Sequence, residues 1–427
     1  MKKIIHFVYP ILALAVVGWV IINLFTEAHA GSSNFREINL PESQTFPMAI
    51  TEDSFGNIWF VKRDSAKIVR LSGAFGNAPS MTEYTVPRND VFLTGIAVDN
   101  QGNIWVGELA NGPVLAMVES GILKFDPATN TFTEWKIPAR GYATGTFAPL
   151  AVAVHPSGHV WMTYSGGNRI AELYPDTDPI SPNTLIEYDL PAPSAAFGTN
   201  FSPVGLAIHP VTGDVYVAEG YLANVISRFS LSSSGGFTAT AMFPIPDPYG
   251  IGLTGVIRPG VTEIIGMAFD AQKHLWFNAG APLELDDLGS YCTLTAYPLP
   301  AGGAPLGGDI GGPAKKWWFL QPGSNQIGQV DAPTVTSHFT VYSQPFFVTT
   351  PVPLPIPPIP KSANPLPGLI SVSPTSATNV PTGGFNFYTI PTANSGPSGI
   401  VVRGNHIVVT EELQNYGQPD KIVVLRP

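Results

Sequence analysis

One short hairpin pattern recurs along this chain of 427 residues, and it restricts the possible folds more than any other feature of the sequence. Each copy joins a turn to an apolar run that contains an aromatic residue. The copies read "FGNIWFVK" at 55–62, "QGNIWVGE" at 101–108, "SGHVWMTY" at 157–164, "TGDVYVAE" at 212–219, "QKHLWFNA" at 272–279 and "AKKWWFLQ" at 314–321. Because the spacing is roughly 45 to 60 residues, the pattern predicts a repeat protein built from units of that size.

A small residue precedes the aromatic residue in every copy, and an apolar strand and a turn such as "DNQG" lie between them. A weaker seventh copy is centred on Val408. The small residues are Ala49, Gly95, Ala151, Gly205, Gly266, Gly308 and Gly399. An apolar strand, a turn and a second apolar strand in this order predict a β-hairpin.

A second pattern alternates apolar and polar residues and ends in proline, as in "MTEYTVP", which closes at Pro87. Proline has no backbone N–H, so this pattern is typical of an exposed edge strand. A third strand, as in "KIVRLS", lies between the hairpin and the edge strand. The four strands together have the size of one propeller blade, and we expect an all-β fold, a β-propeller.

The two ends of the chain predict how the ring closes. The last unit, "GIVVRGNHIVVTE" followed by "KIVVLRP", has no edge strand, whereas a spare one stands at 35–41. The N-terminal strand is therefore expected to complete the C-terminal blade. We expect seven four-stranded blades with a Pro-rich insertion at about 346–391; a degenerate eighth blade in that segment is the alternative.

Composition and charge restrict the class of protein further. Glycine and proline number 43 each, and such a density of helix breakers disfavours a helical fold. The net charge is −10, and no run rich in Lys and Arg is present, so we expect no nucleic-acid partner. A single cysteine, Cys292, cannot form an internal disulfide.

The N-terminus has the features of an export signal. Lys2 and Lys3 precede an apolar run at 4–25, and "EAHA" offers a cleavage site after Ala30. We expect residues 1–30 to be a signal peptide and 31–427 to be a single propeller domain, periplasmic or extracellular. The apolar run is also long enough to span a bilayer, so an uncleaved membrane anchor at 4–25 is the alternative, and membrane contact is expected only there.

The hairpins resemble those of the streptogramin B lyase family, also called virginiamycin B lyase-like, whose repeat has the form G-I-A-x-x-x-x-G-x-L-W-F-T-E followed by N-x-I-G-R-I. "GIAVDNQGNIWVGE" at 95–108 and "WWFLQPGSNQIGQV" at 317–330 match it best. The resemblance implies a β-propeller that opens a cyclic depsipeptide by elimination, with a divalent metal, usually magnesium, and a histidine base. The family often has histidine immediately before the small residue. This chain has Met48, Thr94, Leu150, Val204, Ile265, Gly307 and Ser398 there, and no histidine.

Candidate site residues follow from the geometry of a blade. The first strand begins and the second strand ends at the same end of the ring, so residues three positions after each aromatic residue are expected around the tunnel mouth. These are Lys62, Glu108, Tyr164, Glu219, Ala279, Gln321 and Glu411. Glu108, Glu219 and Glu411 are candidate ligands of Mg²⁺ or Ca²⁺. Lys62, Tyr164 and Gln321 are candidates for binding a polar ligand, and simple hydrated strand ends are the third possibility.

The histidines are expected to be structural or solvated, because a general base must reach the tunnel mouth. His155, His159, His209, His274 and His406 lie in or beside the hairpin turns, which belong to the opposite end of the ring, and His338 precedes an edge strand. Two functions therefore remain. The favoured one is an exported propeller that binds a small molecule, a peptide or an extracytoplasmic protein without lyase chemistry. The alternative is a metal-dependent lyase or a lactonase-like hydrolase.

Overall fold

A computed structural model of the 427-residue chain describes residues 34–427 with gaps. The residues outside the description are 1–33, 44, 77, 112–119, 138–147, 166–168, 176–183, 191–201, 221–224, 233–235, 246–264, 288–291, 298, 300–304, 312–315, 331–336, 342–383 and 414–418. The predicted signal segment and most of the Pro-rich segment thus lie outside the described residues. Within the described part of the chain, no helix is both long enough and apolar enough to cross a membrane.

The first four sheets each take four consecutive strands of the chain in antiparallel order. The first comprises β2 (Pro47–Glu52), β3 (Ile58–Lys62), β4 (Lys67–Ser72) and β5 (Ser80–Thr85). The second comprises β6 (Val91–Val98), β7 (Ile104–Ala110), β8 (Gly121–Asp126) and β9 (Thr131–Lys136). The third comprises β10 (Ala148–Val154), β11 (Val160–Ser165), β12 (Arg169–Leu173) and β13 (Leu185–Asp189). The fourth comprises β14 (Ser202–Ile208), β15 (Val215–Gly220), β16 (Val225–Ser232) and β17 (Gly236–Pro244).

The last three sheets depart from this consecutive order. The fifth comprises β18 (Ile265–Phe269), β19 (Leu275–Asn278), β20 (Pro282–Asp287), β21 (Cys292–Ala296) and β25 (Ser337–Val341). The sixth comprises β22 (Leu306–Gly311), β23 (Lys316–Gln321), β24 (Gln326–Val330) and β26 (Phe385–Thr389), with the 3₁₀ turn η3 (Pro322–Ser324) between β23 and β24. The seventh comprises β27 (Ser395–Arg403), β28 (His406–Leu413), β29 (Lys421–Leu425) and β1 (Phe35–Asn39).

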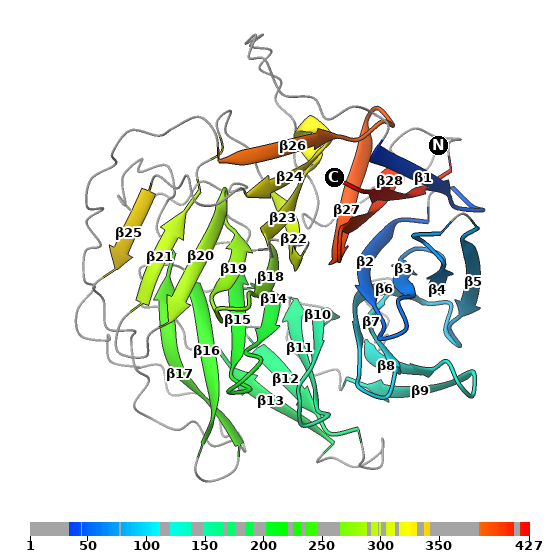
Figure 1. The fold of residues 1–427 in the computed structure, drawn as a ribbon. Helices are drawn as coiled ribbons and strands as arrows, with labels where there is room; N and C mark the ends of the chain where they lie inside the picture. The colour runs from blue at the N-terminus through cyan, green and yellow to red at the C-terminus, as the bar shows by residue number, and fades with distance from the viewer. Residues whose placement is uncertain are drawn as a thin grey trace, which may run out of the picture.

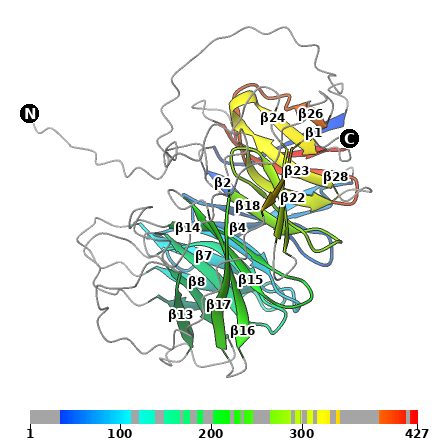
Figure 2. The same ribbon diagram turned by 90° about the vertical axis from the view of Figure 1, so that its left-hand side faces the viewer.

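The seven sheets form a closed ring, as Figure 1 shows. Each first strand contacts the first strands of both neighbouring sheets, in the order β2, β6, β10, β14, β18, β22, β27 and back to β2. Figure 2 shows the strands of the fourth blade side by side in green. The predicted seven-bladed β-propeller is confirmed.

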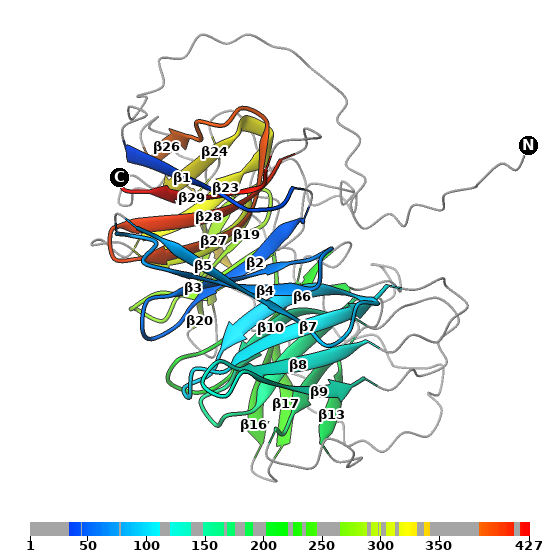
Figure 3. The same ribbon diagram turned by 90° about the vertical axis from the view of Figure 1, so that its right-hand side faces the viewer.

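The N-terminal strand completes the C-terminal blade, also as predicted. β1 pairs antiparallel with β29, with Phe35 opposite Leu425 and Asn39 opposite Lys421. Figure 3 shows β1 in blue beside the red strands of the C-terminus. Lys421 Nζ also lies 2.7 Å from Glu37 Oε2 across this pair. The ring is therefore closed by backbone hydrogen bonds between the two ends of the chain.

The small residue of each hairpin marks a β-bulge in the first strand. The pairing of first and second strands shifts register there in all seven blades, for example between Leu93 and Ile96. A Cβ atom on Gly95 would stand 2.5 Å from the carbonyl oxygen of Leu150 in the next blade. The residue is small because two backbones meet at this point near the centre of the ring.

Seven hydrophobic clusters hold the blades together, one in each interface between neighbours. Successive residues of a second strand face different neighbours. Trp105 packs toward the third blade, whereas Ile104 and Val106 pack toward the first blade. The core of this fold is therefore divided between the interfaces, and every second strand is buried on both faces.

The outer strands around the Pro-rich segment differ from the prediction. β25 adds a fifth strand to the fifth blade, pairing with β21, and β26 is the outer strand of the sixth blade. Residues 385–391, which the sequence assigned to the insertion, thus include a blade strand. The reason is that "FNFYTIP" carries the edge-strand pattern itself and pairs with β24 across a long connection.

Candidate functional site

The ring has two ends that differ in their connections. The hairpin end carries the turns between first and second strands, such as 53–57 and 99–103. The loop end is the opposite one, where first strands begin and second strands finish. All seven predicted positions lie on second strands near the loop end, or immediately after them, because each follows its aromatic residue by three places.

These positions are buried rather than open. Lys62, Glu108, Tyr164, Glu219 and Glu411 are each 0% exposed, and Ala279 is 1% exposed. Glu108 shares the face of β7 that carries Ile104 and Val106, so its side chain lies in the interface with the first blade. The strand alternation that places apolar residues in the interfaces thus places these side chains there as well.

Burial raises the pKa of all three glutamates, which favours their neutral carboxylic acid forms over the carboxylates. Burial raises the pKa of Glu108 to about 7, and the nearby carboxylate of Glu134 adds to the shift. Burial raises the pKa of Glu219 and of Glu411 to about 8 in each case. Neither carboxyl oxygen of Glu108 has a hydrogen-bond partner, and Glu219 accepts one hydrogen bond, from the hydroxyl of Ser227.

Glu108, Glu219 and Glu411 do not converge. They come from the second, fourth and seventh blades, and in the described part of the chain they do not belong to a group of ligand atoms close enough to share one ion. Their assignment as ligands of Mg²⁺ or Ca²⁺ stays a prediction. Each carboxyl would have to lose its proton first, because a metal ion binds the carboxylate form.

The candidates for polar ligand binding have protein partners. Lys62 Nζ lies 2.5 Å from Glu83 Oε1 and 3.4 Å from Glu42 Oε2. Tyr164 packs in the cluster between the second and third blades. Gln321 is partly buried, and its side-chain oxygen accepts a hydrogen bond of 3.2 Å from Ser324. Their role in ligand binding also stays a prediction.

Two of the residues that immediately precede the small residues, Thr94 and Ser398, make hydrogen bonds between neighbouring blades. Thr94 Oγ1 donates a 2.5 Å hydrogen bond to the carbonyl of Pro149, at the bulge of the next blade. Ser398 Oγ donates a 2.6 Å hydrogen bond to the carbonyl of Pro47 in the same way. The two polar side chains among the seven positions therefore satisfy buried carbonyl groups where blades meet.

Among the described residues, no histidine lies on the loop-end half of a first or second strand, the strands that line the tunnel. His155, His159, His209, His274 and His406 lie in or next to turns at the hairpin end, and His338 lies on β25. His155 Nε2 is 2.9 Å from the carbonyl oxygen of Gly213 in the next blade. Burial lowers the pKa of His155, which favours its neutral form.

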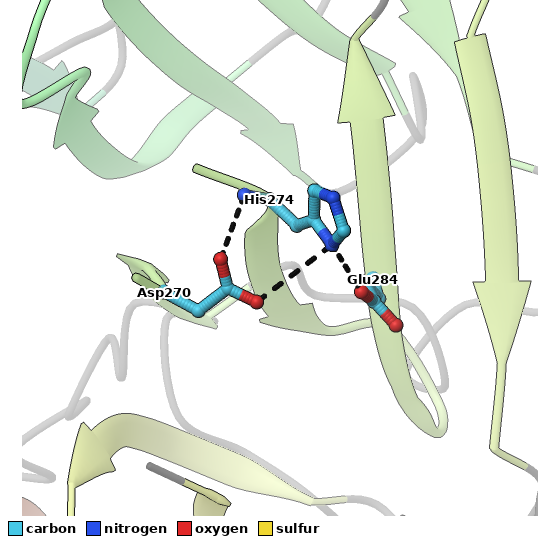
Figure 4. Close-up of side chains that lie close together, drawn as sticks. All are labelled: Asp270, His274 and Glu284. Carbon is cyan, nitrogen blue, oxygen red and sulfur yellow. Dashed lines mark hydrogen bonds and ion pairs between the residues drawn. The ribbon is translucent and has the colours of Figure 1, made fainter. Parts of the chain in front are cut away.

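One group of potential metal ligands is present among the described residues, and the sequence did not predict it. Asp270, His274 and Glu284 offer ligand atoms that all lie within 4.8 Å of one another (Figure 4). Asp270 and His274 come from the turn between β18 and β19, and Glu284 from β20. The signal in the sequence was a histidine two residues before Trp276, but the partner on the third strand is visible only through strand pairing, where Trp276 lies opposite Glu284.

The comparisons with known proteins agree with this fold. The sequence model described as Virginiamycin B lyase family matches residues 28–229. Over these residues the chain resembles the virginiamycin B lyase family. The matched region includes the first three blades and part of the fourth. No curated protein sequence shows a significant match to this chain.

Solved structures extend the fold similarity beyond the matched region. A catalytically inactive histidine-to-alanine variant of virginiamycin B lyase from Staphylococcus aureus, solved with quinupristin, superposes with a TM-score of 0.62 at 19% identity, covering 92% of this chain and 99% of the other. A streptogramin B lyase structure gives a TM-score of 0.60 at 18% identity, covering 92% and 96%. At these identities the similarity establishes the propeller fold of this virginiamycin B lyase-like chain and leaves its activity open.

Proposed function

We propose that this protein is an exported propeller that binds an apolar small molecule or peptide at its loop end and lacks the elimination chemistry of the streptogramin lyases. One observation carries the proposal. Of the eight histidines in the sequence, His6 and His29 lie in the predicted signal segment, and the remaining six lie at hairpin turns or on β25. Among the described residues that connect strands at the loop end there is no histidine.

The comparison with the Staphylococcus aureus enzyme makes this absence informative. Replacing one histidine by alanine gives the catalytically inactive form of that enzyme. Elimination needs a general base within hydrogen-bond reach of the proton that it removes. Five of the six remaining histidines are held in or beside turns at the opposite end of the ring, and His338 lies on the outermost strand of the fifth blade, so none is positioned at the tunnel mouth.

The electrostatics of the loop end support the same proposal. Burial raises the pKa of Glu108, Glu219 and Glu411, which reduces the negative charge that these side chains offer to a cation. The side chains where the second strands finish, at the loop end, are thus suited to packing between neighbouring blades.

The residues at the start of the first strands indicate the class of ligand. Met48, Leu150 and Val204 are partly exposed, apolar and placed where the first strands enter the ring. Apolar side chains with a few polar groups are typical of pockets for small ligands. Quinupristin, the molecule present with the Staphylococcus aureus enzyme, is a suitable first probe of such a site.

The test is to incubate the purified protein with quinupristin and Mg²⁺, with the Staphylococcus aureus enzyme as the positive control, and to follow the products by chromatography and mass spectrometry. We expect no conversion by this protein. A product of unchanged mass and altered retention would show elimination and overturn the proposal. A product heavier by one water would show hydrolysis and support the lactonase-like alternative.

Metal dependence at the loop end is tested separately. Melting temperature is measured with and without Mg²⁺ or Ca²⁺ for the wild type and for the triple variant Glu108→Gln, Glu219→Gln, Glu411→Gln. Gln has the shape of a neutral Glu, so we expect no difference in the metal response of the two proteins. A stabilisation by metal that only the wild type shows would establish a carboxylate metal site and favour the metal-dependent enzyme.

A further inference from the structure

We infer that Asp270, His274 and Glu284 form a binding site for one divalent transition-metal ion, of the Zn²⁺ class, at the hairpin end of the fifth blade. The three side chains come from one turn and the strand beside it (Figure 4). This site is separate from the loop end, and it does not depend on the ligand proposed there.

The ligand atoms lie near the spacing that a shared ion needs. His274 Nδ1 lies 2.5 Å from Glu284 Oε1 and 3.7 Å from Asp270 Oδ2. Zn²⁺ binds nitrogen and oxygen ligands at about 2.0–2.2 Å, so neighbouring ligand atoms around one ion stand roughly 3–4 Å apart. Glu284 Oε1 must therefore move away from Nδ1 by roughly 0.5–1.5 Å, which a side-chain rotation of this partly exposed residue supplies, for the ion to enter between these atoms.

Surrounding groups orient the ligands. Trp276 Nε1 donates a 3.0 Å hydrogen bond to Asp270 Oδ2, and Tyr297 Oη donates a 2.7 Å hydrogen bond to Glu284 Oε2. Asp286 Oδ2 lies 3.7 Å from His274 Nε2, on the other side of the ring. Asp286 is beyond hydrogen-bond distance of Nε2 and acts only through its charge, and the nitrogen that faces Asp270 and Glu284 is Nδ1.

The ion is identified by its ligands. One imidazole and two carboxylates suit Zn²⁺ or Mn²⁺, whereas Mg²⁺ and Ca²⁺ take oxygen ligands. The side chain of His274 is 27% exposed and that of Glu284 is 19% exposed, so solvent can reach the site and complete the coordination. Binding through Nδ1 requires that the proton in the Nδ1–Oε1 hydrogen bond leave this position, either to Nε2 of the same ring or to solvent.

Other blades show that His274 and Glu284 are not required by the turn, whereas Asp270 has the place of the turn aspartate of the first and second blades. The first and second blades have Asn57 and Asn103 in the place of His274, and each donates a 2.8 Å hydrogen bond to the turn aspartate. The third blade has His159 beside Glu172 at 2.7 Å, but His155 stands where the fifth blade has Asp270. In the described part of the chain, the fifth blade alone combines all three ligands.

The test uses the untagged protein, so that no added histidines bind metal. Zn²⁺ and Mn²⁺ are titrated by isothermal calorimetry, and melting temperature is measured at each concentration. We expect one ion per chain and a rise in melting temperature of at least about 2 °C at saturation, because an ion bound only by the folded state stabilises it. The variant His274→Asn should lose at least about 10-fold in affinity while keeping the turn, since Asn is accepted there in two other blades.

The matched control is His159→Asn in the third blade. It changes the same turn position, beside Glu172 and Tyr188, and should leave the affinity for the metal ion unchanged. Glu284→Gln provides a second variant in the site, and circular dichroism checks that each variant is folded. Absence of bound Zn²⁺ and Mn²⁺ in the wild type would overturn the inference. So would binding that is unchanged in both His274→Asn and Glu284→Gln.

Discussion

At the scale of the residue, a hydrogen bond to an aspartate of the turn holds the hairpin tryptophan of the first, second and fifth blades, in addition to packing. Trp59 Nε1 donates to Asp53 at 2.8 Å, and Trp105 Nε1 donates to Asp99 at 2.9 Å. The same aspartate accepts from the backbone of the turn, so one carboxylate joins turn and core. The third blade has a histidine in the place of this aspartate, and the buried Nε1 of Trp161 has no hydrogen-bond partner there.

Replacing this aspartate should destabilise a blade. For Asp99→Ala we expect a loss of about 2–4 kcal/mol in the free energy of unfolding, because a buried indole N–H and the turn amides lose their acceptor. Chemical denaturation monitored by tryptophan fluorescence measures the loss. Asp126→Ala, in an exposed turn, is the control and should cost less than half as much; equal losses would contradict this role of Asp99.

The buried glutamates predict a pH dependence of stability. Burial raises the pKa of Glu219 to about 8 in the folded protein, whereas the unfolded chain ionises near the ordinary value of 4.5. Its contribution to stability is therefore complete below about pH 4.5 and is lost as the pH rises from there to about 8. For Glu219→Gln, melting temperature should fall less steeply between pH 5 and pH 8 than for the wild type.

A control variant distinguishes the ionisation of Glu219 from a general effect of net charge on stability. A hydrogen bond from Thr129 lowers the pKa of Asp126, so the contribution of Asp126 is lost only in acid, as the pH falls through that lowered pKa. Asp126→Asn should therefore leave the slope between pH 5 and pH 8 unchanged. A Glu219→Gln variant with the slope of the wild type would show that Glu219 does not ionise in this range.

At the scale of the element, the bulge in each first strand decides how closely neighbouring blades approach. Gly399 would place a Cβ atom 2.1 Å from the carbonyl oxygen of Met48, and Gly266 would place one 2.3 Å from the amide nitrogen of Gly308. Gly266 also has a φ of +72°, which only glycine adopts without strain. The recurring small residue in the sequence is thus explained by contact between blades.

Enlarging one of these residues should loosen the ring. In Gly95→Ala the new methyl group would stand 2.5 Å from the Leu150 carbonyl oxygen, so the second and third blades must move apart. We expect a loss of about 1–3 kcal/mol, measured by thermal or chemical unfolding. Gly323→Ala is the control, since nothing lies within 4 Å of its Cβ position, and it should change stability by less than about 0.5 kcal/mol.

At the scale of the whole molecule, the N-terminal strand carries the closure of the ring. β1 contributes the outer strand of the seventh blade, and Thr392 Oγ1 and Lys421 Nζ both bind the carboxylate of Glu37. Without β1, the edge of β29 would present unpaired backbone groups and the apolar residues beneath it.

Removing β1 should weaken the ring without removing a blade. A protein that begins at residue 42 is expected to melt at a lower temperature and to aggregate more than one that begins at residue 31, which keeps β1. A synthetic peptide of residues 34–41 added in trans should restore part of the lost stability. Equal melting temperatures for the two proteins would show that the ring does not depend on this strand.

The sequence by itself determined the architecture of this protein. The hairpin around each aromatic residue, the edge strand closed by proline and the spare N-terminal strand are local patterns, and local patterns define strands, turns and their order. The C-terminal boundary of the Pro-rich insertion does not follow from local patterns, because β26 pairs with β24 across a long connection.

Only the tertiary structure decided the environment of the candidate site residues. Glu108, Glu219 and Glu411 had equivalent places in the repeat, but the packing of neighbouring blades buries them and raises the pKa of each. His274 looked like an ordinary turn residue until strand pairing placed Glu284 beside it. Burial and the meeting of side chains from different strands depend on the whole ring, whereas the repeat depends on short stretches of chain.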